Sequence, residues 1–259
     1  MGIVNVTPDS FSDGGRFDST PAAIEHALRL IDEGADILDI GGESTRPGAS
    51  AVPLAEELRR IIPLLEALRD KNIALSVDTC KPAVMQAAVA AGADMINDID
   101  ALQAEGALEA VSGSTVAVCL MHKQGTPQTM QQQPEYSDVV GEVMAFLAAR
   151  QTACEQAGIA RERLVIDPGF GFGKTLAHNI ALLRHLERFQ QLGAPLLAGL
   201  SRKSMLGAIT GLGVEQRLQP SVAAALLAAL KGAKILRVHD VQATRQALQI
   251  VNAIEGIEE

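Results

Sequence analysis

The chain has 259 residues, 47% of them hydrophobic, with no Trp and a single Tyr. Its length suits one barrel domain as well as two smaller domains, and its net charge of −9 argues against nucleic-acid and membrane-surface partners, which need a basic face. The three cysteines are odd in number and have no paired spacing, and the longest apolar run, Val222 to Leu230, is too short to span a bilayer; we therefore expect a cytoplasmic protein without a disulfide framework, zinc site or membrane segment.

Short apolar runs alternate with helical patterns from end to end. Each run is apolar on both sides, as a strand covered on both faces must be. Helix starts are marked by Thr20-Pro21 and Lys81-Pro82, and Pro63 should kink the helix in which it falls. The predicted strands, in chain order, are Ile3–Val6, Ile37–Ile40, Ala74–Val77, Met95–Ile99, Val116–Leu120, Leu164–Ile166, Leu196–Ala198 and Ile235–Val238.

A short repeat stands between helical patterns and strands. It reads Gly34-Ala35-Asp36, then Gly92-Ala93-Asp94, then Gly232-Ala233-Lys234. Glycine just after a helix supplies the left-handed turn that sends the chain back into a sheet. Eight such βα units in one chain favour an α/β fold of the closed (β/α)8 barrel type, with a single domain over residues 1–259. The alternative is a Rossmann-like open sheet, which would have fewer strands and a glycine fingerprint after the first one.

The ends of the predicted strands are unusually polar. Any single Asp or Asn there could cap the following helix, but capping alone does not explain so many polar residues on one rim. In a barrel of this type the loops that follow the strands carry the active site. We therefore predict the site at this rim, formed by Asn5, Asp78, Asn97, Asp167, Lys203, Arg237 and His239.

Arg237 and His239 lie two residues apart on a predicted strand, so their side chains point the same way. A guanidinium and an imidazole that converge on one point suit a phosphate oxygen. His239 alone could be a structural histidine, but the basic stretch from Ser201 to Ser204 follows the preceding strand. We therefore expect an anion at this part of the rim.

The segment from Pro168 to Thr175 ends in Gly-Lys-Thr but is not a P-loop, which would need glycine where Pro168 stands. We expect its alternating glycines to let the backbone approach a planar ligand beside Asp167. Of the six Phe residues, four fall in the loops after the first and sixth strands: Phe11, Phe17, Phe170 and Phe172. They either stack on a flat ligand or pack beneath their own loops.

Two long stretches are similar to the opening signatures of the dihydropteroate synthase family. They are Gly2 to Gly15, which reads GIVNVTPDSFSDGG, and Gly41 to Gly48, which reads GGESTRPG. Shorter matches follow in order along nearly the whole chain: Ser76-Val77-Asp78-Thr79, Ile96-Asn97-Asp98, Asp167 to Lys174, Ser201 to Ser204 and Arg237-Val238-His239.

The resemblance implies a folate-pathway transferase. It would join 4-aminobenzoate to 6-hydroxymethyl-7,8-dihydropterin diphosphate, giving 7,8-dihydropteroate and diphosphate. It also implies magnesium as cofactor, a homodimer and competition by sulfonamides in the aminobenzoate pocket. Family members usually carry a further N-terminal segment over the lower mouth of the barrel, whereas this chain opens at its first predicted strand.

The resemblance assigns a role to each matching position. The pterin would contact Asp78, Asn97, Asp167 and Lys203, with Met121 and Phe172 lining its slot. The diphosphate would lie against Asn5, Thr45, Arg46, Arg237 and His239, with Asn5 also binding Mg²⁺. The aminobenzoate pocket would be formed by Phe11, Arg46, Pro47 and Ser204, and Arg46, Asp78, Lys203, Arg237 and His239 would carry catalysis.

Physical chemistry is consistent with these roles. The reacting carbon is attached to an electron-rich ring, so C–O cleavage can precede attack, and the main barrier is charge building on the departing diphosphate. An arylamine that attacks a cation needs no strong general base. Two rival functions are a folate-binding module of a methyltransferase, which has no use for a diphosphate clamp, and a catalytically silent pterin-binding paralogue.

Overall fold

The computed structural model describes residues 1–6, 19–44, 51–125, 130 and 134–255. Within these residues eight parallel strands alternate with α-helices. The strands are β1 Gly2–Asn5, β2 Ile37–Gly41, β3 Ala74–Asp78, β4 Met95–Asp98, β5 Ala117–Met121, β6 Leu164–Asp167, β7 Leu197–Ala198 and β8 Ile235–Leu236. The helices are α1 Ser19–Asp32, α2 Leu54–Leu68, α3 Pro82–Ala90, α4 Ala107–Ser112, α5 Val139–Gln156, α6 Leu176–Arg184, α7 Ser204–Thr210, α8 Leu218–Leu230 and α9 Val241–Glu255. All eight predicted strands are confirmed to within two residues at each end.

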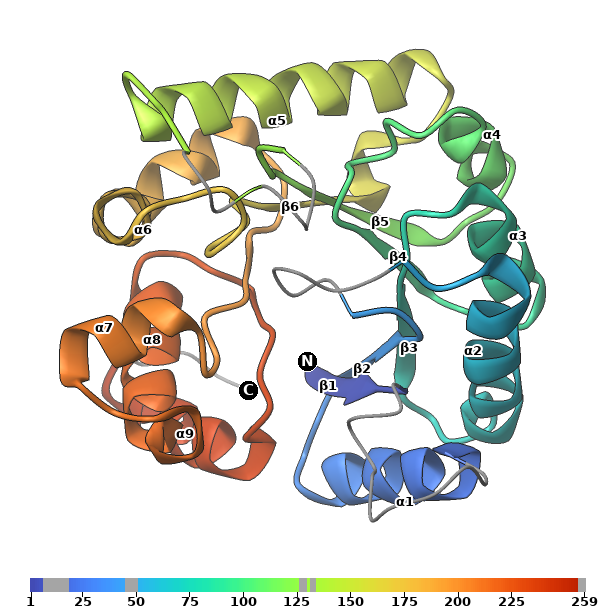
Figure 1. Cartoon of the computed structure of the whole chain (residues 1–259), viewed down its shortest axis with the longest axis horizontal. Coiled ribbons are helices and arrows are strands. Elements are labelled where there is room, and N and C mark those ends of the chain that lie inside the picture. Colours follow the sequence, from blue (N-terminus) through green and yellow to red (C-terminus); the bar gives the residue numbers. More distant parts are fainter. Residues whose placement is uncertain (7–18, 45–50, 126–129, 131–133, 256–259) are drawn as a thin grey trace.

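Figure 1 shows the helices arranged around strands β1 to β6, with α7, α8 and α9 on the remaining side. Strands β1 to β6 make one parallel sheet in chain order, and β7 pairs with β8. Single bridges join the two sheets at both edges, Ile166 with Leu196 and Gly2 with Val238. At the second join the amide of Ile3 donates to Val238 O at 3.1 Å. The architecture is the predicted (β/α)8 barrel.

Alternate residues of each strand point into the ring, because side chains of a strand alternate between its faces. The lower part of the interior is apolar and is filled by Met1, Met95, Cys119, Val165 and Leu197. The residues that point outward pack under the helices in the larger core. The polar side chains of the interior lie at the strand ends and, for Asp39 and Ser76, two residues before them.

The turns that return the chain to the sheet follow the predicted chemistry. Gly34, Gly92 and Gly232 have φ values of 91°, 98° and 97°, in the left-handed region that favours glycine. Pro82 occupies the first turn of α3, as expected. Helix α2 runs continuously past Pro63, so the predicted kink does not end the helix. None of the described helices is long and apolar enough to cross a membrane.

Candidate active site

Strand register places the predicted rim residues side by side. Asn5 pairs with Gly41, Gly41 with Asp78, and Asp78 with Asn97, so these residues form one row across four strands. Met121, at the end of β5, pairs with Asp167 at the end of β6. The carboxyl ends of parallel strands lie at one end of a barrel, and the rim predicted from the sequence is therefore a single surface.

A charged network occupies the interior just below this rim. The Nε of Arg237 donates to Asp39 at 2.5 Å, and its Nη2 donates to Asp78 at 2.9 Å. The other oxygen of Asp39 accepts from the Ser76 hydroxyl at 2.6 Å, and Asn97 Nδ2 donates to Asp39 at 3.2 Å. One guanidinium thus bridges two carboxylates that are both almost fully buried.

The carboxylate of Asp78 has one buried oxygen without a partner in the described part of the chain. This atom is Oδ1, whereas Oδ2 accepts from Arg237. Burial raises the pKa of Asp78 to about 7, and the nearby Asp39 charge works in the same direction against Arg237. A buried oxygen of this kind needs a hydrogen-bond donor, and a ligand with N–H groups would provide it.

Asp167 and Lys203 form the opposite side of the site. Asp167 Oδ1 accepts from the Gly169 amide at 2.7 Å, and burial raises the pKa of Asp167. Burial lowers the pKa of Lys203 to about 8. The Lys203 ammonium donates to the Phe170 carbonyl and lies 4.7 Å from the centroid of the Phe172 ring. A carboxylate, an ammonium and an aromatic ring thus meet at one place, an arrangement that suits a flat polar heterocycle.

The loop of residues 168–173, between β6 and α6, contains three alternating glycines whose backbone angles and close contacts account for the absence of side chains there. Gly169, Gly171 and Gly173 have φ values of 69°, 80° and 62°. A Cβ at Gly169 would collide with the carbonyl of His122, and one at Gly173 with the carbonyl of Gln124. Gly169 and Gly173 therefore admit the backbone of the loop after β5, whereas a Cβ at Gly171 would meet the Lys203 side chain; the approach of these glycines to a ligand stays a prediction. Phe170 is fully buried, which agrees with one of the two expectations for the loop Phe residues, that they pack beneath their own loops.

The anion-binding part of the prediction stays a prediction, and the described residues show only where its members lie. The structure directs Nε and Nη2 of Arg237 to Asp39 and Asp78, so an anion would have to use the remaining guanidinium N–H groups. His239 Nδ1 lies 2.9 Å from the Ser201 hydroxyl, which also accepts from the His239 amide. Ser204 is exposed at the first residue of α7. Phe11, Thr45, Arg46 and Pro47 lie outside the described residues.

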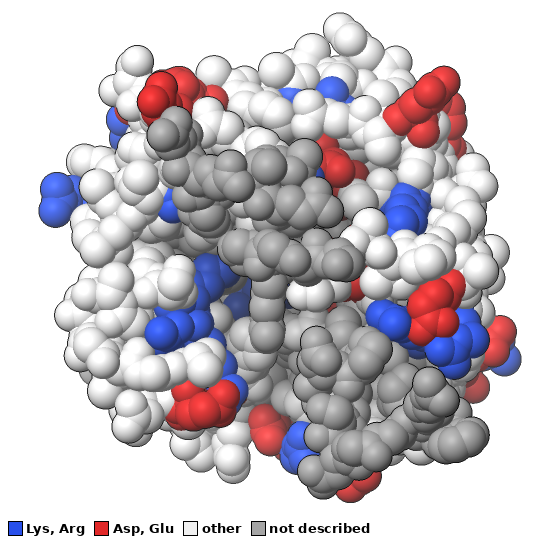
Figure 2. All heavy atoms as spheres, in the orientation of Figure 1, with Lys and Arg blue, Asp and Glu red and all other residues white. Residues whose placement is uncertain are grey.

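The site balances charges of both signs although the chain as a whole is acidic. Three carboxylates, from Asp39, Asp78 and Asp167, adjoin the cations of Lys203 and Arg237. Figure 2 shows a group of Lys and Arg side chains to the left of the centre of the face seen in Figure 1. Positive charge is therefore present on this face although the molecule as a whole is negatively charged.

The described residues contain no cluster of three or more His, Cys, Asp or Glu side chains able to enclose a metal ion. Asn5, at the end of β1, offers one amide oxygen next to Gly41. Mg²⁺ is typically held by one or two protein oxygens together with substrate phosphates and water. Asn5 therefore fits an ion that is held mainly by the substrate.

Two residues that matter in this geometry were missed by sequence reasoning. Asp39 was counted within an apolar strand, yet it lies two residues before Gly41 and so shares the inward face with the rim. An ionisable residue in a run such as Ile37-Leu38-Asp39-Ile40 was the available signal. Lys174 was named as part of a rejected P-loop and of a family match but was given no role, although the structure buries it almost completely.

A family comparison matches residues 1–239 to the family described as pterin binding enzyme. The dihydropteroate synthase of Escherichia coli (strain K12) is 52% identical over 254 residues, which cover 98% of this chain and 90% of the relative.

Two solved structures from Xanthomonas albilineans are similar along almost the whole chain. Dihydropteroate synthase with 4-aminobenzoic acid is 58% identical with a TM-score of 0.94, covering 99% of this chain and 93% of the other. The same enzyme in complex with 7,8-dihydropteroate is 55% identical with a TM-score of 0.90 and the same coverage. One of these structures thus holds a substrate of the synthase reaction and the other holds its product.

Proposed function

The chain belongs to the family of pterin-binding enzymes, and from that premise we propose that it catalyses the dihydropteroate synthase reaction. It is a transferase of folate biosynthesis that joins 4-aminobenzoate to 6-hydroxymethyl-7,8-dihydropterin diphosphate and releases diphosphate. The observation that carries the proposal is the buried Asp78 Oδ1, an acceptor without a partner in the described residues, which lies at the same rim as Asp167 and Lys203.

Recognition of the pterin rests on carboxylates that have been taken out of water. The amino-pyrimidinone edge of a pterin presents adjacent N–H donors, which a carboxylate accepts together, and Asp167 is suited to this contact. Asp78 and Asn97 lie in one row on the neighbouring strands and would take further polar atoms of the ring. Phe172, stacked near Lys203, and Met121 would cover its faces.

The chemistry is a substitution at the carbon that carries the diphosphate. The C–O bond breaks with its electron pair going to diphosphate, and the electron-rich pterin stabilises the cation left behind. The amine of 4-aminobenzoate then forms the C–N bond and releases a proton. Arg237 and His239, together with Arg46 and Thr45 from the undescribed segment, would neutralise the leaving group in place. Lys203 would hold the ring, and Phe11, Pro47 and Ser204 would form the aminobenzoate pocket where sulfonamides compete.

Magnesium is proposed as the cofactor, held by Asn5 and the diphosphate. When bound, it supplies positive charge to the phosphate oxygens. The chain's own residues would then fix the position of the diphosphate.

A diphosphate-release assay with both substrates and Mg²⁺ tests the proposal. We expect diphosphate to appear only when the pterin diphosphate and 4-aminobenzoate are both present, together with one equivalent of dihydropteroate. A methyltransferase module or a silent paralogue would bind pterin without releasing diphosphate. Pterin binding without any diphosphate release would therefore overturn the proposed reaction.

We also propose a cytosolic homodimer. The described cysteines Cys80, Cys119 and Cys154 are free thiols, as in a reducing compartment. Large apolar side chains at least half exposed are concentrated on the last three helices: Ile209 on α7, Leu227 and Leu230 on α8, and Ile250 and Ile254 on α9. Such a patch supports association of two copies. Light scattering after gel filtration should give twice the mass of 27.2 kDa, and a monomer at micromolar concentration would contradict it.

A further inference from the structure

Lys174 is a buried lysine that the proposed reaction does not use. Its residue is 3% exposed, and the acceptors around its ammonium are uncharged. Burial lowers the pKa of Lys174 to about 7; the Asp167 charge opposes this shift and the Lys203 charge adds to it. Placing an ammonium there costs free energy, so the contacts it makes must be needed by the fold or by the site.

The ammonium joins two loops of the rim. Nζ lies 2.9 Å from Nδ1 of His122, in the loop after β5. It also donates to the carbonyls of Gly169 at 2.9 Å and Phe172 at 3.0 Å, in the loop after β6. An ammonium has three N–H donors for these three close acceptors, with the His122 carbonyl as a fourth, more distant acceptor at 3.3 Å, whereas a neutral amine has only two N–H groups. Burial lowers the pKa of His122 to about 3, so its ring is neutral and can accept.

The bonded atoms belong to residues that shape the ring slot. The amide of Gly169 fixes one oxygen of Asp167, and Lys174 holds the carbonyl of the same Gly169. The Phe172 carbonyl is held by Lys174 while its ring faces Lys203. Lys174 therefore restrains the backbone on both sides of the slot-forming side chains.

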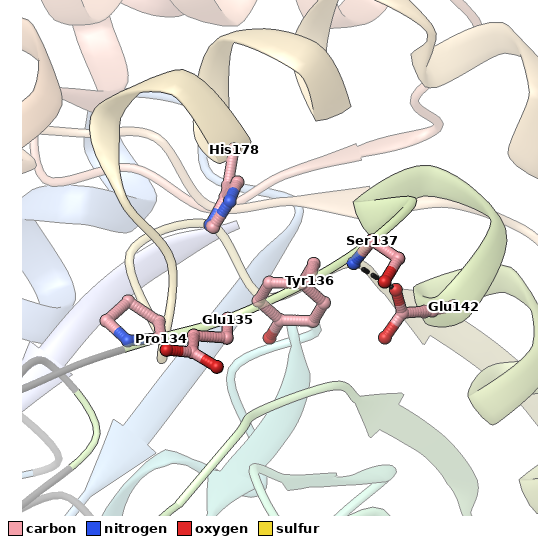
Figure 3. Close-up of a pocket in the computed structure, with 6 residues that line it drawn as sticks. All are labelled: Pro134, Glu135, Tyr136, Ser137, Glu142 and His178. Carbon is pink, nitrogen blue, oxygen red and sulfur yellow. Dashed lines mark hydrogen bonds between the residues drawn. The ribbon is translucent and has the colours of Figure 1, made fainter.

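The outer side of the same loop is held separately. The Tyr136 hydroxyl donates to the Gly173 carbonyl at 2.9 Å. Tyr136 faces His178 edge-on with 5.0 Å between ring centroids, beside a surface cavity of about 580 Å³ (Figure 3). The side chain of Asn179 accepts from the Gly171 amide at 2.7 Å. These bonds anchor the outer part of the loop, and Lys174 is the contact that ties its inner part to His122.

We propose that Lys174 is a positioning residue of the pterin slot, holding residues 168–173 against the loop after β5 so that Asp167 and Phe172 keep their places. The inference rests on the proposed function, since it assumes that this slot takes the pterin. It requires no contact between Lys174 and the substrate. Loss of Lys174 should weaken pterin binding and not aminobenzoate binding, because the residues assigned to the aminobenzoate pocket lie on other segments.

Lys174→Met tests this role. The matched control is Lys234→Met, because Lys234 is exposed and directly precedes β8, at the end of the strand away from the site. His122→Phe is a milder second variant that removes one acceptor and keeps a ring against Phe146, whose ring is 4.9 Å away. Steady-state kinetics with each substrate varied gives the two KM values. Calorimetry with 6-hydroxymethylpterin gives the Kd of the slot without turnover, and thermal melting reports folding.

We expect Lys174→Met to raise the KM for the pterin diphosphate and the pterin Kd about ten- to a hundredfold, with the KM for aminobenzoate changed by less than about twofold. His122→Phe should show the same split at about two- to tenfold, and it carries the test if Lys174→Met does not fold. A merely structural role would lower kcat through the active fraction and leave both KM values unchanged, which would overturn the proposal.

The two proposals fail in different ways. Wild-type protein that binds pterin but releases no diphosphate would overturn the proposed reaction, and the calorimetric comparison would still decide the role of Lys174. A folded Lys174→Met or His122→Phe variant with a wild-type pterin Kd would overturn the positioning role alone. Wild-type protein that binds no pterin would overturn both.

Discussion

Replacing Arg237 by Ala removes the cation that bridges Asp39 and Asp78. Both carboxylates are almost fully buried, and each loses a charge-assisted hydrogen bond, at 2.5 Å and 2.9 Å. Removing one partner of a buried ion pair leaves an uncompensated charge and costs about 3–5 kcal/mol of folding free energy. We expect the free energy of unfolding at pH 8 to fall by about that amount.

Urea denaturation of the wild type and of Arg237→Ala at pH 8 and pH 6 measures this cost. Protonation of the orphaned carboxylates relieves it, so the difference between the two proteins should shrink at the lower pH. The combination of Arg237→Met, Asp39→Asn and Asp78→Asn is the matched control, because it removes all three charges together and should recover most of the stability. An Arg237→Ala protein within about 0.5 kcal/mol of wild type at pH 8 would refute the bridging role.

The same variant also tests the proposed hold on diphosphate. Loss of charge-assisted bonds to the leaving group should cost about 1.5–3 kcal/mol, or roughly ten- to a hundredfold in kcat/KM. The measurement is made on folded variant at pH 6, where the stability loss is smallest. Unchanged kinetics there would remove Arg237 from the diphosphate site and leave it only a structural role.

Three further outcomes are expected. The pKa of Asp78 in the folded state, about 7, exceeds its ordinary value of 3.8, so the folded state binds more protons between these two pH values, and the free energy of unfolding falls as pH rises from 3.8 to 7. Asp78→Asn should flatten this part of the pH profile measured by urea denaturation. An unaltered slope would contradict the pKa shift. Gly173→Ala forces an alanine into the left-handed region and its Cβ onto the Gln124 carbonyl, so the free energy of unfolding should fall by about 1–3 kcal/mol. Gly113→Ala, with open space around it, is the control and should stay within about 1 kcal/mol of wild type. Equal effects of the two variants would count against the packing argument. Chelation with EDTA should abolish diphosphate release and Mg²⁺ should restore it, with Asn5→Ala needing more Mg²⁺; full turnover in EDTA would exclude the metal.

The barrel itself could be predicted because its signals are local. A buried parallel strand requires a short apolar run, and a return turn requires glycine at a left-handed position, as Gly34, Gly92 and Gly232 confirm. The rim followed from topology, since side chains at the carboxyl ends of parallel strands share one end of the barrel. Asp78 and Asp167 lie there as expected.

The bonding within the rim could not be predicted because it depends on contacts between distant segments. Arg237 is 198 residues from Asp39 along the chain, and no local pattern reveals that the two meet. Lys174 and His122 are 52 residues apart and belong to different loops. Both cations were therefore interpreted from their neighbours in sequence, Arg237 as an anion ligand and Lys174 as part of a rejected nucleotide loop.

The two joins of the ring divide the site into an acidic and a basic part. Asp39, Asp78 and Asp167 belong to the six-stranded sheet, whereas Lys203 and Arg237 follow the two-stranded one. Short joins connect these sheets: at β8–β1 the amide of Val238 donates to Met1 O at 2.9 Å and that of Ile3 to Val238 O at 3.1 Å, and at β6–β7 the amide of Ile166 donates to Pro195 O at 3.0 Å. Any substrate that contacts both parts therefore spans the two sheets, and filling the site adds contacts between them beyond these short joins.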